Sequence, residues 1–298
     1  MRTKLFFISV FTLICSVAIG QSKLSYSLAV GDEFKVYQNT SQDILQDMNG
    51  QQHNITSNID GEFTFIVNKV SSEFIEFTFK FDRLTMLSKS NLAGELMAVD
   101  TSKEAEETDI MGRMLSQLIG IDLQMTMYKN GKVKEIKGAE AIIDKMVGIL
   151  PNLDELSKAQ IKASMASDFS SESLANSFEQ MTYIYPSDNN VAVGDTWTNG
   201  FKGELSSENI WTLNEVTDSS ANIQGEGDVT FITEDDSISM NLKGTMTSEI
   251  MTDLETGFIK NMSVESVAKG NSELKQMSGT EIPTTVTTIT SYKIDHVQ

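Results

Sequence analysis

The sequence has little of what enzymes use most often for chemistry. Its 298 residues include one Cys, two His, three Pro and two Trp. A histidine-based metal site needs more nitrogen or sulfur ligands than Cys15, His53 and His296 supply. A Ser-His-Asp triad would need one of those histidines, and no Gly-x-Ser-x-Gly turn is present. We therefore expect no catalytic residue, no bound metal and no cofactor, and hence a protein that is not an enzyme.

Positive charge is also scarce. Lys and Arg together number 23 against 42 Asp and Glu, which gives a formal net charge of −19 at pH 7. A surface of that sign repels nucleic acid and anionic membranes and favours solubility. Nucleic acid is therefore not expected as a partner. The three prolines argue against a Pro-rich linker between domains.

Residues 1–20 have the layout of a secretory signal peptide. Two basic residues precede an apolar run, and Ala18 and Gly20 are small residues at the −3 and −1 positions before Gln21. The run is shorter than the ~20 apolar residues of a membrane span. We expect export to the periplasm or the outside, cleavage before Gln21 and no transmembrane span in the mature chain, which N-terminal sequencing would check. Cys15 lies inside the run, so the mature chain is expected to lack disulfides.

Two stretches of the same pattern, Leu28–Phe34 and Val191–Trp197, organise the rest of the chain. Each places Gly-Asp between an apolar stretch and an aromatic residue. Glycine can adopt positive φ, and aspartate can bond its own backbone in a turn. We interpret both stretches as turns that lead into a strand, with Phe34 or Trp197 entering the core.

Strand-like segments follow each of these turns. The side chains of Ile75, Phe77, Phe79 and Phe81 alternate with polar residues, and the segment from Ile238 to Ile250 alternates over a greater length. Period-two alternation is typical of a strand with one face on the core and one in water. Hairpin turns are predicted at Asn49-Gly50 and Asn130-Gly131, and the β-branched run Thr284–Ile294 is expected to be the last strand.

Helical patterns occupy two regions. Thr101–Glu104 has the spacing of a capping box. The apolar stripe that follows is interpreted as core, because Met fills irregular gaps: Ile110, Met111, Met114, Leu115, Leu118 and Ile119. Residues 139–182 carry three further amphipathic pieces, which end with Leu174, Phe178 and Met181 at helical spacing.

Three landmarks recur in the same order in both halves. Besides the Gly-Asp turns, Val67-Asn-Lys-Val resembles Leu213-Asn-Glu-Val, and Lys129-Asn-Gly resembles Glu255-Thr-Gly. We expect a mainly β (α+β) fold with antiparallel sheets in two duplicated units and a central helical insert. The two units form either two related lobes or one long curved sheet. The expected boundaries are residues 1–20 for the signal peptide, 21–137 for the first β-rich unit, 138–182 for the helical insert and 183–298 for the second unit.

The landmarks also carry a family resemblance. An early Val30-Gly31-Asp32 with Phe34, then Tyr185-Pro186 followed by Val193-Gly194-Asp195-Thr196-Trp197, and a late Thr256-Gly257-Phe258-Ile259 follow the leader. The sequence resembles a family of uncharacterised exported proteins, common in Bacteroidota, that carry a domain of unknown function. The resemblance implies export and a β-rich fold. It assigns no activity and no functional residue.

Three functions remain open from the sequence. The first is a non-enzymatic envelope or secreted protein that binds an apolar ligand or a protein partner, because amphipathic strands and helices could enclose such a ligand. The second is a hydrolase that uses carboxylates alone, and the third is a structural or adhesive surface protein. An apolar cavity of ~300 Å³ or more would favour the first. Two carboxylates facing each other in a cleft, ~5–10 Å apart, would favour the second.

Overall fold

The computed structural model describes residues 22–150, 154–188, 190–203, 205–234, 238–275 and 280–297. The expected signal peptide and Cys15 therefore lie outside the described residues. No helix within the described ranges is both long and apolar enough to cross a membrane.

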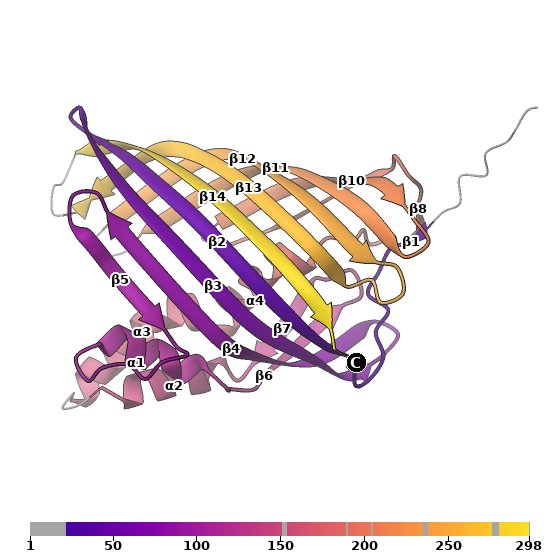
Figure 1. Ribbon diagram of the computed structural model, residues 1–298, viewed down its shortest axis with the longest axis horizontal. Helices are drawn as coiled ribbons and strands as arrows, with labels where there is room; N and C mark the ends of the chain where they lie inside the picture. Colours follow the sequence, from indigo (N-terminus) through magenta and orange to yellow (C-terminus); the bar gives the residue numbers. More distant parts are fainter. Residues whose placement is uncertain are drawn as a thin grey trace, which may run out of the picture.

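One antiparallel sheet of twelve strands dominates the fold (Figure 1). Its order is β7-β6-β4-β3-β2-β14-β13-β12-β11-β10-β9, and β5 pairs with β4. A two-stranded sheet joins β1 (Ser22–Lys23) to β8 (Asn190–Val191). The large sheet contains β2 (Glu33–Met48), β3 (Gln51–Val70), β4 (Phe74–Ser90), β5 (Gly94–Asp100), β6 (Leu123–Tyr128), β7 (Val133–Lys137), β9 (Thr196–Phe201), β10 (Leu205–Val216), β11 (Ser220–Glu234), β12 (Ile238–Asp253), β13 (Ile259–Leu274) and β14 (Glu281–His296).

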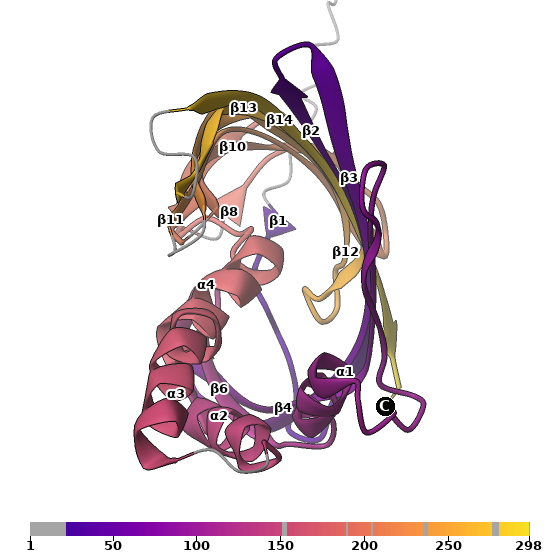
Figure 2. The ribbon, with the colours of Figure 1, turned by 90° about the vertical axis from the view of Figure 1, so that its left-hand side faces the viewer.

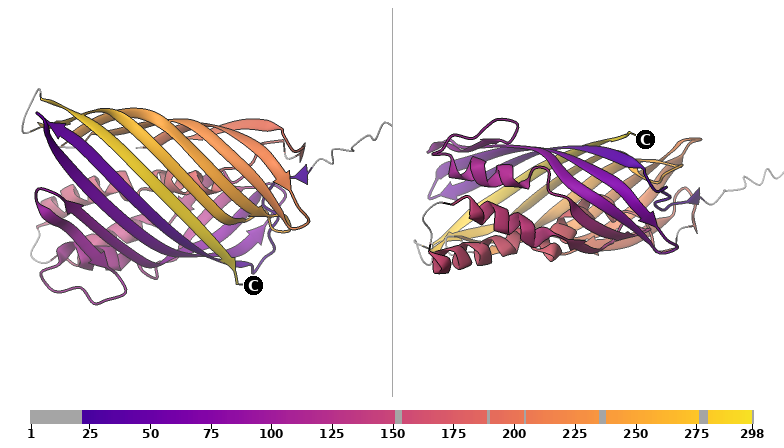
Figure 3. Two further views of the ribbon diagram at one scale, coloured as in Figure 1. Left: turned by 45° about the horizontal axis from the view of Figure 1, so that its top comes forward. Right: turned by 90° about the horizontal axis from the view of Figure 1, so that it is seen from below.

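The sheet is strongly curved, and its concave side faces the helices (Figures 2 and 3). The helices are α1 (Ile110–Leu115), the 3-10 turn η1 (Ser116–Leu118), α2 (Ala139–Gly148), α3 (Glu155–Phe169) and α4 (Ser171–Thr182). Short helices of this kind gain most of their stability from packing. In α2, for example, Ile142, Met146 and Val147 are buried.

Helix α4 lies against both edge strands of the sheet, β7 and β9. A Glu179 carboxylate oxygen accepts the backbone N–H of Val133 in β7 at 3.0 Å. On the other side, the segment that follows α4 is bonded to β9, because Trp197 Nε1 donates to the Ile184 carbonyl at 2.9 Å. Helix α4 thereby covers edges that would otherwise present unpaired backbone groups.

Aromatic side chains fill one end of the concave side. The rings of Phe34 and Phe258 stack with centroids 4.1 Å apart, and Tyr26 meets Tyr185 edge-on at 5.2 Å. All four side chains are buried. Ring pairs of this geometry add to the stability that burial gives. This end is therefore packed solid, and any open space lies elsewhere along the strands.

The structure confirms the mainly β, antiparallel class, and it places the two halves in one sheet. It corrects the first helix. Thr101 does not cap it: its hydroxyl bonds Leu84 of β4. The helix begins only at Ile110, where Asp109 Oδ1 accepts the Gly112 N–H at 2.8 Å. The spacing of a capping box at residues 101–104 was thus misleading, because that segment extends the β4–β5 edge.

The two Gly-Asp turns have the same geometry. Gly31 and Gly194 have φ of +98° and +94°. Asp32 Oδ2 accepts the Ala29 N–H at 2.8 Å, and Asp195 Oδ2 accepts the Ala192 N–H at 2.9 Å. Both aspartates serve the turn, as predicted, and Phe34 and Trp197 are both buried.

We expect Gly194→Val to lower the free energy of unfolding by ~1–2 kcal/mol, because a β-branched residue is strained at positive φ. No atom lies within 4 Å of the site where its Cβ would stand, so the loss would report backbone strain rather than collision. Asp195→Ala should cost about 0.5–1.5 kcal/mol, one hydrogen bond. The measurement is denaturant unfolding.

A suitable control is Gly148→Val, because that position is equally open but has no positive φ. It should change stability by no more than ~1 kcal/mol. Gly31→Val should behave as Gly194→Val does. A Gly194→Val protein as stable as the unmodified protein would contradict the turn assignment.

Candidate functional site

An apolar cavity of about 560 Å³ lies between the concave side of the sheet and the helices. Strands β3 to β5 form one wall, and α1, η1, α3 and α4 form the other. Most of its lining is aliphatic, aromatic or Met: Ile59, Phe63, Phe81, Leu84, Met86, Met97, Met111, Leu115, Leu118, Phe169, Leu174, Phe178 and Met181. Ligand pockets in proteins commonly occupy 300–1,000 Å³ and are lined in this way.

Local sequence patterns position these side chains. Phe63, Phe81 and Leu84 point to the concave side because their strands alternate, and the register pairs Phe63 with Phe81. A bulge between Glu62 and Phe63 shifts that register, so Leu84 rather than Arg83 also faces inward. Phe178 of α4 lies edge-on to Phe79, with centroids 4.5 Å apart, and joins the helix to the sheet.

Helix α1 forms the rim of the cavity. Leu115 and Leu118 are buried as the apolar stripe predicted, but Ile110 and Met111 are 53% and 45% exposed. Met111 also lines the cavity. The interpretation of the whole stripe as core is therefore only partly correct. Methionine is flexible and adapts its shape, so Met86 and Met97 of the sheet wall and Met111 of the helix wall give the cavity a lining that can repack.

A smaller pocket of about 70 Å³ adjoins the cavity, and Gln180 and Tyr292 line both. Hydroxyl and amide groups line much of the smaller pocket, among them Ser248, Ser266, Thr288 and Thr290. Ser248 Oγ is buried without a hydrogen-bond partner in the described structure. The wall of the smaller pocket therefore contains a buried hydroxyl whose hydrogen-bonding capacity is unused.

Glu179 is the carboxylate in the wall of the smaller pocket. Burial raises its pKa above the ordinary value, and the bond from the Val133 N–H and the charge of Lys132 lower it in part. The same carboxylate accepts the backbone N–H of Val133 at the edge strand β7. Its geometry is therefore that of a residue that fixes α4 against the sheet.

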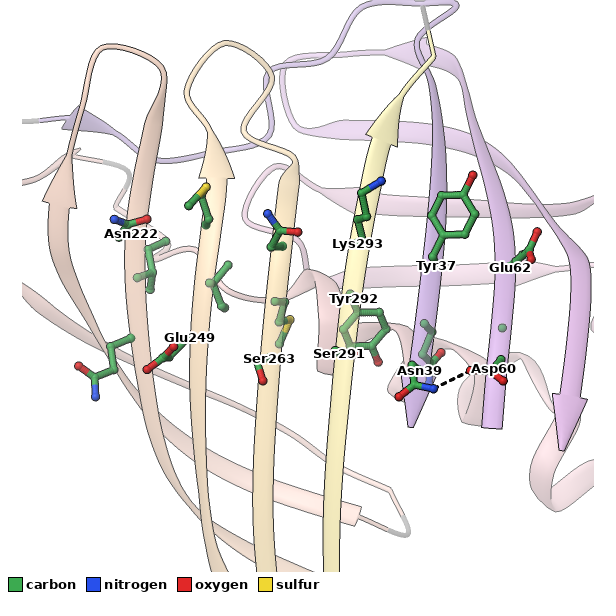
Figure 4. Close-up of a pocket in the computed structure, with 18 of the residues that line it drawn as sticks. Tyr37, Asn39, Asp60, Glu62, Asn222, Glu249, Ser263, Ser291, Tyr292 and Lys293 are labelled. Carbon is green, nitrogen blue, oxygen red and sulfur yellow. Dashed lines mark hydrogen bonds between the residues drawn. The ribbon is translucent and has the colours of Figure 1, made fainter. Parts of the chain in front are cut away.

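The convex side of the sheet is hollowed into a polar groove of about 870 Å³ (Figure 4). The register aligns two rows of side chains across adjacent strands. One row is Gln224, Glu249, Ser263, Ser291, Asn39 and Asp60, and the other is Asn222, Met251, Asn261, Lys293, Tyr37 and Glu62.

Asp60, Glu62 and Glu249 line this groove; the first two have side-chain partners, and Glu249 stands four strands away from Asp60 in the same row. Asp60 accepts from Asn39 Nδ2 at 2.6 Å and from Thr85 Oγ1 at 3.0 Å, while Glu62 pairs with Arg83 at 3.2 Å. Asp60 and Glu62 point the same way from one strand. A glycosidase-type pair would flank a substrate, with one carboxylic acid and one carboxylate. The groove provides hydrogen bonds, and its carboxylates have no such arrangement.

The two histidines lie at opposite ends of β2. His53 bonds Gln46 and Ser90, whereas the His296 ring stacks on Phe34 and lies 3.6 Å from an Asp32 oxygen. Phe34 and Gln46 are twelve residues apart in the same strand, which corresponds to ~40 Å. The structure therefore does not bring the histidines together. Among the described residues, no group of three or more His, Cys, Asp and Glu is placed to hold a metal ion.

Fold and cavity together describe a mostly antiparallel protein whose curved sheet and helices enclose an apolar pocket with a polar end. The chain belongs to the family of unknown function DUF6263, whose model matches residues 72–259. No curated protein matches it.

Two solved structures illustrate how remote its structural likenesses are. An outer membrane channel from Pseudomonas putida F1 has 9% identity and a TM-score of 0.25, over 91% of this chain and 97% of that chain. OmpF of Salmonella typhi in complex with daunomycin has 8% identity and a TM-score of 0.25, over 90% and 99%. Such low values carry no argument about this protein's fold or function.

Proposed function

We propose that this protein binds an apolar ligand in the cavity between the concave sheet and helices α1 and α4, and that it acts as an exported, non-enzymatic carrier or receptor. The observation that carries the proposal is the cavity itself, about 560 Å³ of space lined by Phe, Met, Leu and Ile side chains. The pocket is half open, and a ligand seated in it would remove these apolar side chains from water, which is favourable.

The rim supports a route into the cavity. Ile110 and Met111 of α1 are exposed apolar side chains, and Leu96 of the neighbouring strand β5 is 50% exposed. Of these side chains Met111 lines the cavity, and an exposed apolar side chain at a pocket is typical of a ligand or partner site. Export rests on the signal-peptide pattern of residues 1–20 alone.

The proposal is tested first with the neutral fluorophore N-phenyl-1-naphthylamine, which brightens in apolar surroundings. We expect saturable binding. Met86→Trp, which fills the cavity, should weaken binding about 10-fold or more, equivalent to ~1.4 kcal/mol. Leu87→Trp is the matched control, because the adjacent residue of β4 points to the convex side and should leave binding unchanged.

Native mass spectrometry of protein purified from its own host should also show a bound small molecule that denaturation releases. Failure of the fluorophore to bind, or equal binding by both Trp variants, would contradict the proposal. The carboxylate-based hydrolase and the structural or adhesive protein stay hypotheses, and neither has an observation that favours it over the cavity.

We also propose that the two β-rich units arose by duplication, with the helical residues inserted between them. The matching turns support this proposal. The Gly31 N–H donates to the Val67 carbonyl, and the Gly194 N–H donates to that of Leu213. A register bulge comes directly after each of the two accepting residues: one lies between Val67 and Lys69, the other between Leu213 and Glu215.

A further inference from the structure

The concave side of the sheet lacks charge, although 65 of the 298 residues are Asp, Glu, Lys or Arg. In the four central strands β2, β14, β13 and β12, the inward positions contain none of these residues. Charged side chains of these strands, such as Glu249, Glu265 and Lys293, stand at the alternate, outward positions, and Lys260 lies in a bulge of β13 beside Asp253. Charged residues are thus absent from the inward face of these strands and present on the outward face.

Polar groups nevertheless interrupt the concave side. One cluster joins Gln46, Ser272 and Thr284, and a separate band crosses the middle of β2 and β14. Thr40 and Thr290 bond each other at 3.1 Å, and Gln42 donates to Thr288 at 3.3 Å. Beside them, the Tyr292 hydroxyl and the Gln180 amide stand where the two pockets meet. Neither side chain makes a hydrogen bond within the described part of the chain. The apolar cavity and the polar band therefore meet at the Tyr292 hydroxyl and the Gln180 amide, and each of these groups can donate a hydrogen bond.

The walls also determine which charge a bound ligand can carry. Neither pocket is lined by Lys or Arg, and Glu179 is the only acidic residue lining either pocket among the described residues. A carboxylate or phosphate brought into such a space would lose its hydration without gaining a cation. It would also be repelled by Glu179 when that group is ionised. An uncharged hydroxyl, ester or amide needs only the hydrogen bonds that the band offers.

We propose that the ligand is an uncharged amphiphile, such as a long-chain alcohol or monoacylglycerol. Its chain occupies the cavity, its polar end bonds Tyr292 and Gln180, and the pocket rejects the fatty acid anion of the same length. This rests on the proposed function and specifies the chemical class that the site selects.

The test is displacement of N-phenyl-1-naphthylamine at pH 8 by 1-dodecanol and by laurate, two ligands with equal chains and different charge. We expect dodecanol to displace the fluorophore at a concentration at least about 10-fold lower than laurate. Tyr292→Phe should weaken dodecanol binding by roughly 3–10-fold, because one hydrogen bond is lost. Tyr37→Phe is the matched control, since that tyrosine lies on the neighbouring strand and faces the convex groove.

A change of charge should reverse the preference. Gln180→Lys places a cation of similar length where the two pockets meet and should make laurate the better ligand, whereas Gln180→Met should weaken dodecanol binding without favouring laurate. Equal displacement by dodecanol and laurate in the unmodified protein, with the fluorophore bound normally, would overturn this inference and leave the proposed function standing. Absence of fluorophore binding would overturn both.

Discussion

Trp211→Ala is expected to lower the free energy of unfolding by about 3–5 kcal/mol, the cost of removing a large buried aromatic side chain. The Trp211 side chain is 2% exposed, and its Nε1 donates to Asn199 Oδ1 at 2.7 Å. Its ring lies over Gly225 of the adjacent strand β11, with which it pairs in register. The substitution would therefore leave a cavity and would remove the shorter of the two hydrogen bonds that Asn199 Oδ1 accepts.

Denaturant unfolding would measure this loss, and the adjacent residue supplies the control. Ile210 belongs to the same strand but is 55% exposed on the other face, so Ile210→Ala should change stability by no more than ~0.5 kcal/mol. A Trp211→Ala protein that loses no more than the Ile210→Ala protein would show that the indole does not support the fold.

Gly225 provides an independent check of the same contact. A Cβ at position 225 would collide with the Cζ3 and Cε3 atoms of the indole. Gly225→Ala alone should therefore cost ~1–3 kcal/mol by overpacking. In the Trp211→Ala background that collision is gone, so the double variant should be more stable than the sum of the two losses predicts. Strict additivity would contradict the packing described here.

Much of the β structure could be predicted from the sequence, because the controlling patterns are local. Alternation placed Phe77 and Phe79 on one face of a strand, and Asn49-Gly50 forms the predicted turn with φ of +58° and +89°. The Gly-Asp turns were also correctly interpreted. The prediction that failed also rested on a local pattern. The capping-box spacing at Thr101 indicated a helix start, but Thr101 bonds the edge of β4, and only tertiary pairing reveals that contact.

The site could not be predicted, because it depends on long-range register. The run Thr284–Ile294 indicated a strand, but nothing local shows that Thr288 and Thr290 face Gln42 and Thr40, some 250 residues earlier in the chain. The apolar stripe of α1 is equally ambiguous, since core and cavity walls use the same residues. One pattern could have pointed to the band: inward polar residues at alternate positions within an otherwise β-branched run.

Two buried tyrosine side chains should make the stability of the fold depend on pH. Tyr185 donates its hydroxyl to the Gly257 carbonyl at 2.6 Å, and Tyr26 donates to the Thr182 carbonyl at 3.0 Å. Both side chains are 1% exposed. Burial raises the pKa of each phenol above its usual value. The nearby Tyr185 raises the pKa of Tyr26 further. The folded state therefore holds both protons to higher pH than the unfolded chain does.

Stability should consequently fall in alkali. Below pH ~10, where an unfolded tyrosine titrates, both states keep the protons and the contribution is fully present. As pH rises from there towards the raised pKa values of the folded state, the unfolded chain loses the protons first. The free energy of unfolding should then fall by about 1.4 kcal/mol per pH unit for each phenol, roughly 3 kcal/mol for both.

Urea unfolding at pH 8, 10 and 11 would measure this fall. The Tyr26→Phe, Tyr185→Phe double variant should be less stable at pH 8 by ~1–3 kcal/mol, because two hydrogen bonds are lost, yet it should lose less between pH 10 and 11. Tyr37→Phe, at a position 38% exposed on the convex side, should retain the alkaline slope of the unmodified protein. If the double variant showed that same slope, groups other than these phenols would control the alkaline transition, and the assignment would be wrong.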